Sequence, residues 1–191
     1  MTLSAVALAS RALLKIGAES ISGFDDASTE AEVAAALYGP IRDALVSAYP
    51  WSFATGQSSL ARLDARPMAD FDFAFQLPDG FLRALSAGAG PRGRGLRYRI
   101  TGRHLHANSK HVVLTYIFRP AEGDVPPFFD QALIARLAAE MAIPLTESTT
   151  RAETLTRLAE EEFRRARTID AQQDTPSRFE DFSLIQARGG R

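Results

Sequence analysis

The chain has 191 residues, of which 46% are hydrophobic, so it is long enough for one large domain or for one domain with an inserted module. Its formal net charge of −1 gives no general indication of nucleic acid or an anionic membrane as a partner. The lack of cysteine excludes disulfides, thiolate catalysis and cysteine-ligated metal sites. No apolar stretch is long enough to span a bilayer, and no basic segment precedes the apolar N-terminus, so we expect a cytoplasmic protein without a membrane partner.

The first fifty residues predict two helices. The first covers residues 3–16 and ends at Gly17, a residue type that accepts a left-handed helix end without strain. The second begins near Thr29, which stands three residues before Glu32 in the spacing of a capping box, and it ends before Pro50. Its apolar positions recur every four residues and form one stripe: Val33, Leu37, Ile41, Leu45 and Tyr49.

Residues 51–126 differ, because prolines and glycines are frequent and the apolar runs are short. Alternating segments at 71–75, 96–100 and 104–106, with a denser apolar run at 112–118, predict a small antiparallel sheet of three to five strands. The glycine-rich, basic segment 88–95 lacks the closing Lys-Ser or Lys-Thr pair and the following helix of a phosphate loop. We interpret it as a flexible hairpin tip.

Helix is predicted again over residues 127–171. Pro127 suits a first helical turn, and an apolar stripe follows at Phe129, Leu133, Leu137, Met141 and Leu145. Pro144 should end or kink this helix, and a fourth helix carries Leu155, Leu158, Phe163, Ala166 and Ile169.

The order of these elements predicts a mainly helical α+β fold, a four-helix bundle with a small antiparallel β module inserted between helices 2 and 3. Residues 1–50 would supply helices 1 and 2, residues 51–126 the β module, and residues 127–171 helices 3 and 4. Residues 172–191 would form an extended C-terminal tail.

No motif indicates a reactive centre. His104, His106 and His111 lie close enough in sequence for a metal site, but solvated strand histidines are the more ordinary interpretation. The Gly-x-Ser-x-Gly and His-Glu-x-x-His signatures are missing. We therefore expect no enzyme activity, no catalytic residues, no metal and no cofactor, with a hydrolase of dispersed residues as the weakest alternative.

Every charged residue between Phe81 and Ala121 is basic, in a chain that is close to neutral overall. Such a surface suits DNA, whose phosphates favour it through counterion release, or the negative face of an identical or different subunit. A solvated sheet face is the third interpretation. We call the candidate residues the basic lobe: Arg92, Arg94, Arg97, Arg99, Arg103 and Lys110.

The last twenty residues show no helical or strand period, yet they place apolar side chains among polar ones. This pattern is typical of a segment that folds onto a partner, and equally of a frayed terminus. The candidate anchor residues are Arg178, Phe179, Phe182, Leu184 and Ile185.

One segment resembles a known family. Residues 38–54 read Tyr-Gly-Pro-Ile-Arg-Asp-Ala-Leu-Val-Ser-Ala-Tyr-Pro-Trp-Ser-Phe-Ala. They resemble the signature Tyr…Arg-Asp…His-Pro-Trp-x-Phe-Ala of phage tail tubular protein A and related head-to-tail adaptors, including the gene transfer agent adaptor, although Tyr49 stands where many members have His. Further matches follow the family order up to about Ala171, at residues 14–18, 75–78, 81–83, 114–117, 128–133 and 137–142.

The resemblance implies a structural connector without catalytic residues. Members form a twelve-subunit ring below the portal protein, and DNA passes through the ring without sequence specificity. The implied partners are the portal protein, a stopper or other tail-side connector protein, and further copies of the chain. The implied location is the bacterial cytoplasm during assembly and then the neck of the released phage or gene transfer agent particle.

The resemblance also bears on individual residues. It favours residues 178–185 as a portal-docking tail. Within the motif, we expect Pro50, Trp51 and Phe53 to fill the core between bundle and sheet rather than an interface, since large aromatic side chains dominate small cores. A nucleic-acid-binding accessory protein that uses the basic lobe remains the alternative function.

Overall fold

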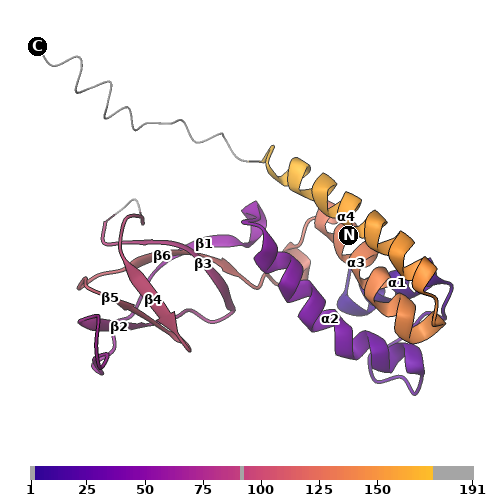
Figure 1. Ribbon diagram of the computed structural model, residues 1–191, viewed down its shortest axis with the longest axis horizontal. Coiled ribbons are helices and arrows are strands. Elements are labelled where there is room, and N and C mark those ends of the chain that lie inside the picture. The colour runs from indigo at the N-terminus through magenta and orange to yellow at the C-terminus, as the bar shows by residue number, and fades with distance from the viewer. Residues whose placement is uncertain (1–2, 91–92, 174–191) are drawn as a thin grey trace, which may run out of the picture.

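The computed structural model describes residues 3–90 and 93–173. In this part of the chain, four helices gather at one end of an elongated molecule and six strands at the other (Figure 1). The predicted α+β fold, with a β module inserted between the second and third helices of a bundle, is confirmed. The predicted tail lies outside the described residues from 174 onward. No helix within the described ranges is both long and apolar enough to cross a membrane.

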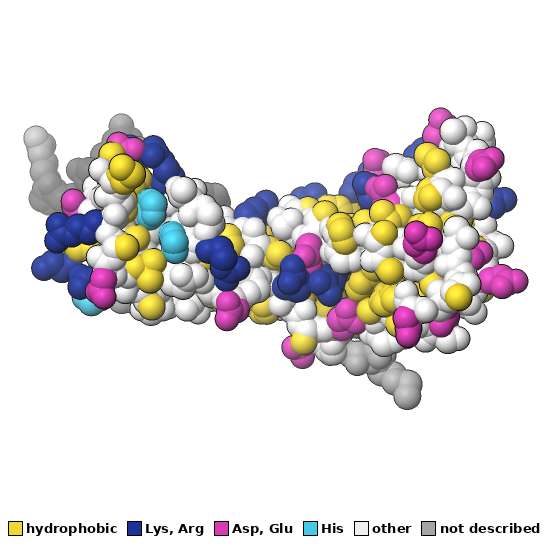
Figure 2. Space-filling model, turned by 90° about the horizontal axis from the view of Figure 1, so that it is seen from below, with side chains coloured by type: hydrophobic (Ala, Val, Ile, Leu, Met, Phe, Trp, Pro, Cys, Tyr) yellow, Lys and Arg dark blue, Asp and Glu magenta, His cyan; other side chains and the backbone are white. Residues whose placement is uncertain are grey.

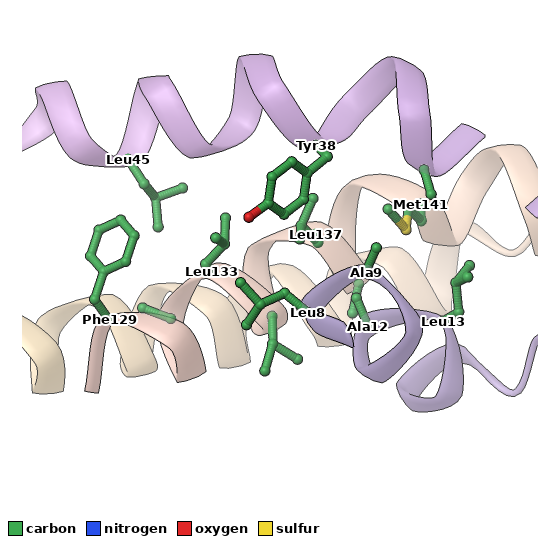
Figure 3. Close-up of a cluster of buried hydrophobic side chains, with 14 of the residues drawn as sticks. Leu8, Ala9, Ala12, Leu13, Tyr38, Leu45, Phe129, Leu133, Leu137 and Met141 are labelled. Carbon is green, nitrogen blue, oxygen red and sulfur yellow. The ribbon is translucent and has the colours of Figure 1, made fainter. Parts of the chain in front are cut away.

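The bundle is built around α3 (Pro127–Thr146). Helices α1 (Ala5–Ile16), α2 (Thr29–Ala48) and α4 (Thr149–Asp170) each pack on α3, whereas α2 and α4 barely touch each other. Figure 3 shows Leu133 and Leu137 of α3 between Leu8 of α1 and Tyr38 of α2. Because α3 is apolar nearly all round, it is the buried centre of the helical half.

Serine side chains begin three of the helices. Ser4, Ser28 and Ser148 each accept a hydrogen bond from the backbone N–H three residues further on. The predicted capping box at Thr29 is therefore wrong by one residue, because Thr29 is already helical and Ser28 supplies the cap. Gly17 ends α1 in the left-handed region with φ 79°, as predicted.

The buried stripes of two helices differ from the predicted ones. On α2 the buried residues include Ala31, Ala34 and Tyr38, while Val33 and Leu37 are only half-buried, because small side chains bring this helix close to its neighbours. On α4 the prediction is wrong at Leu158, which is 49% exposed. The buried positions of α4 are mostly alanine, and α2 also buries Ala31 and Ala34, so a stripe of large apolar residues does not mark these packed faces.

The β module contains two three-stranded antiparallel sheets instead of the single sheet predicted. One sheet has the order β1-β6-β3 and the other the order β2-β5-β4. The strands are β1 (Thr55–Ser59), β2 (Phe73–Gln76), β3 (Phe81–Gly88), β4 (Tyr98–Thr101), β5 (His104–Ala107) and β6 (Val113–Phe118). Two of them, β1 and β3, were missed, because β1 has no apolar residue and two register shifts interrupt β3.

Both sheets enclose a second core, formed around Phe75, Leu105 and Leu114. Single backbone hydrogen bonds also attach the segments after β1 and before β4 to the edge strands β2 and β3. Leu63 N donates to Ala74 O, and Leu96 N donates to Ala87 O, each at 2.9 Å. The edge strands are thus partly covered, which reduces the backbone groups left free for unwanted pairing.

The described part of the glycine-rich segment is held against the first sheet, so the flexible hairpin tip predicted there is wrong for these residues. Gly93 is buried, and its carbonyl accepts a hydrogen bond from Ser86 Oγ at 3.0 Å. A Cβ added to Gly88 would lie 2.2 Å from the backbone nitrogen of Arg94. The absence of a side chain at Gly88 therefore allows the segment to fold back onto the sheet.

We predict that Gly88→Ala lowers the free energy of unfolding by about 2 kcal/mol, because a methyl group there overlaps backbone that must move. Gly90→Ala is the matched control, since a Cβ at Gly90 meets no atom within 4 Å. Urea denaturation followed by circular dichroism measures both variants. Equal effects of the two substitutions would contradict the proposed backbone contact.

Candidate assembly interface

Trp51 lies where the helical half meets the β half. It follows α2, is 0% exposed, and its indole N–H donates to the Leu45 carbonyl at 3.1 Å. Its ring meets Phe129 of α3 edge-on at 5.1 Å and Phe163 of α4 at 5.6 Å. One side chain thus contacts the residues that begin the β module and three helices of the bundle.

The other two residues of this motif, Pro50 and Phe53, differ in burial. Phe53 is half-buried and packs beside Phe129 at 5.2 Å. Pro50 is exposed, so the prediction that it fills the core is wrong. The pyrrolidine ring has no backbone N–H to donate and ends the helical path after Tyr49, which needs no burial.

Asp170 ties the end of α4 to the residue after Trp51. It is 3% exposed, and its two carboxylate oxygens each accept from Ser52 N at 3.1 Å. Ser52 Oγ also donates to Asp170 Oδ1 at 2.7 Å. These donors stabilise the buried carboxylate and fix the end of α4 beside the junction. Sequence reasoning missed this contact, because the two residues are 118 positions apart.

A network of charged and hydroxyl groups surrounds the segment that leads from β6 back to α3, the second connection between the β half and the helical half. Tyr38 Oη and Arg42 Nη1 both donate to Glu122 Oε1, at 3.1 and 3.2 Å. Arg42 also donates to Asp43 Oδ1, from Nε at 3.2 Å and from Nη2 at 3.1 Å, and Arg119 forms a two-pronged pair with the same carboxylate. These bonds join α2 to the segment that leads from β6 into α3.

The environment shifts several pKa values in this region. Burial alone would raise the pKa of Asp43, but the hydrogen bonds and charges of Arg119 and Arg42 outweigh it and hold that pKa below its usual value. Burial raises the pKa of the Tyr38 hydroxyl, and the nearby charge of Glu122 raises it further. Burial also raises the pKa of Asp130 to about 6, against the opposing charge of Arg11.

We predict that Asp43→Asn lowers the free energy of unfolding by about 1–2 kcal/mol at pH 7. Because the folded pKa of Asp43 is depressed, its carboxylate contributes stability above the unfolded pKa of about 4 and loses that contribution as the pH falls through the folded pKa. Thermal unfolding between pH 3 and 7 should show the difference from the wild type shrinking in acid.

The matched control is Asp79→Asn, because the Asp79 side chain pairs with Arg103 but is fully exposed. This substitution should change stability little at any pH. A destabilisation by Asp43→Asn that persists unchanged in acid would show that the network does not act through the ionised carboxylate.

Several charges of the basic lobe are paired or lie over an aromatic ring. Arg99 pairs with Asp70 at 2.7 Å, and Arg103 pairs with Asp79 at 3.2 Å. Arg97 lies over the Phe71 ring at 5.8 Å. The pairing aspartates precede Phe81, which is why inspecting residues 81–121 alone overlooked them.

The remaining residues of the basic lobe are either exposed or outside the described part of the chain. Arg94 and Lys110 are exposed, and Arg92 lies outside the described residues. Residues 51–126 still hold ten basic against six acidic side chains, so the β half keeps a positive balance. Figure 2 shows Lys and Arg at the β end and along the middle of one face, with most Asp and Glu over the helical end. The two ends of the molecule therefore differ in electrostatic charge.

The histidines lie on the β half. His104 and His106 lie on one face of β5, where His106 is opposite Arg99 in the strand register, and His111 is exposed beyond the strand. Within residues 3–90 and 93–173, no three His, Asp or Glu side chains are placed to hold a metal ion together.

A groove opens between α2 and α4 at the end of the bundle near the junction. Its volume is about 250 Å³, and α3 forms its floor. Its lining is largely apolar, with one arginine and one glutamate: Ala44, Leu45, Ala48, Arg136, Ala159, Glu160 and Phe163. No sequence pattern predicts this groove, since it arises from two helices that pack on a third and barely touch each other.

The junction groups bond mainly to one another and to the backbone, an arrangement suited to holding elements in place. The anchor candidates Arg178, Phe179, Phe182, Leu184 and Ile185 lie outside the described residues. A scan against protein-family models and a search of curated proteins found no match to the chain.

Proposed function

We propose that the chain is a structural head-to-tail connector, an adaptor subunit that forms a ring below the portal of a phage or phage-like particle. The observation that carries the proposal is the position of the motif that resembles the adaptor signature. Its residues Tyr38, Arg42, Asp43, Trp51 and Phe53 all lie at the junction between the helical and β halves. They act as a clamp that fixes the angle between the two halves.

A fixed angle is what a ring subunit requires. Neighbours in a ring meet through two different faces, and the ring closes only if each contact repeats the same rotation. If the two halves of a subunit moved independently, the rotation between neighbouring subunits would vary from contact to contact and the ring would not close. The contacts at the junction support a single angle between the helical and β halves: the packing of Trp51, the bonds of Asp170 and the Arg42–Asp43–Arg119 network.

The charge distribution supports the same proposal. A β end with a positive balance and a helical end with a negative balance provide unlike faces for a head-to-tail contact. In the proposed assembly, about twelve copies surround a DNA channel, with the portal protein on one side and a stopper or other tail-side connector on the other. The exposed arginines of the β half either face this DNA or contact the neighbouring subunit.

A second candidate function is a nucleic-acid-binding accessory protein. The observation that favours it is the outer face of the β2-β5-β4 sheet, where Arg97, Arg99 and His106 lie together. Arg99 on this face already lies over the Phe71 ring and pairs with Asp70. These contacts lower the number of positive charges that can bind phosphates.

Deletion of the gene in the producing bacterium should yield particles with filled heads and no attached tails, seen by electron microscopy. Complementation with the wild type should restore tails, and Trp51→Ala should restore few or none, because it loosens the junction. Complete, tailed particles after deletion would overturn the adaptor proposal. Tight, salt-dependent binding of free DNA by the isolated chain, without a tail defect, would favour the second candidate.

A further inference from the structure

The outer face of α2 is unusually apolar for an uncovered helix surface. The exposed positions after its first turn carry no charge, and the last four are spaced four residues apart: Ala35, Ala36, Pro40, Ala44 and Ala48. Exposed helix faces normally carry polar and charged side chains. The last two of these residues form one wall of the groove between α2 and α4, and Ala159 and Phe163 form the other.

This groove leads to the place where the described chain ends. A second, more open hollow is lined by Tyr49, Arg164, Arg167, Thr168, Ala171 and Gln172. Its residues directly follow those of the groove on both helices, as Tyr49 follows Ala48 and Arg164 follows Phe163. A path therefore runs from the end of α4 back into the groove, and the bonds from Ser52 to Asp170 hold the end of α4 in place.

The second hollow carries positive charge, since Arg164 and Arg167 line it. In the groove itself Arg136 pairs with Glu140, and Glu160 also lines it, so the positive charge is concentrated at the second hollow. Arg167 lies over the rings of Tyr49, at 4.8 Å, and Phe163, at 5.9 Å. Among the described residues, no carboxylate pairs with Arg164 or Arg167. An occupant with acidic groups next to apolar ones would match both features.

We propose that residues 178–185 of the same chain occupy this groove. Their sequence, Arg-Phe-Glu-Asp-Phe-Ser-Leu-Ile, places Glu180 and Asp181 between Phe179 and Phe182. The aromatic side chains fill the apolar groove between α2 and α4, while the two carboxylates meet Arg164 and Arg167 at its entrance.

The length of the chain permits this contact. From Phe163 to Gln173 a helical rise covers about 15 Å, and the six residues from Gln173 to Phe179 span about 20 Å when extended. The segment therefore reaches back to Phe163. A short connection also gives the chain's own segment an effective concentration of about 1 mM at the groove, which favours it over the segment of another copy.

This inference does not depend on the adaptor function, since it concerns the free chain. If the adaptor function holds, the groove keeps the proposed portal anchor against its own bundle until the portal provides a competing site. The anchor and the groove would then form a contact that assembly exchanges for another.

The absence of native cysteine allows a direct test by disulfide formation in the full-length chain. Ala44→Cys is combined with Ser183→Cys, which leaves both phenylalanines in place. The matched control combines Ser183→Cys with Leu158→Cys. Leu158 is a half-exposed residue of α4 that adjoins the groove residue Ala159 but does not line the groove. Oxidised glutathione is added, and the products are separated by non-reducing electrophoresis.

We expect the Ala44 pair to form an intramolecular disulfide about 10-fold faster than the Leu158 pair, since docking raises the local concentration at one site only. Adding Phe179→Asp and Phe182→Asp to the Ala44 pair should remove this difference. Equal rates for the two pairs would overturn the proposal. Disulfides formed between chains would also overturn it and would assign the groove to the segment of a second copy.

Discussion

The burial of a single indole links the two halves of this protein. Trp51 leaves no surface to solvent, satisfies its N–H on the last turns of α2, and packs edge-on against aromatic rings of α3 and α4. The chain enters the β module directly after this residue, so the direction of β1 is set by the packing of the bundle. An aromatic side chain of this size cannot shift without opening a cavity in the core of the helical half.

Polar contacts also hold the two halves together, in addition to the packing of Trp51. The return crossing, from β6 to α3, is tied to α2 through Arg119 and Glu122, so both connections between the halves are anchored on the same helix. Asp170 fixes the end of α4 to the first crossing, which also determines where the C-terminal residues leave the bundle. In the proposed adaptor role, this arrangement would hold the two ends of the molecule in fixed positions for contacts with neighbouring copies.

Local patterns in the sequence predicted the helices well, since the spacing of apolar residues and stop signals such as Gly17 and Pro50 act within one or two turns. They failed where a partner is distant in sequence. Asp43 meets Arg119 from 76 positions away, and Asp70 neutralises Arg99 from outside the basic stretch. Strand β1 escaped because its residues, Thr-Gly-Gln-Ser-Ser, are held by pairing with β6 and not by their own burial pattern. The placement of Trp51 in the core followed from its position just after a helix, whereas the groove between α2 and α4 depends on how three helices pack together.

If the junction fixes one angle between the halves, the distance between spin labels on the two halves must be well defined. Cysteines at Glu32 of α2 and Thr101 of β4, both exposed, carry the labels in a chain without competing thiols. We expect a single narrow distance distribution by double electron–electron resonance, and a broader one when Trp51 is replaced by alanine. A broad or two-peaked distribution in the wild-type chain would contradict a single fixed angle.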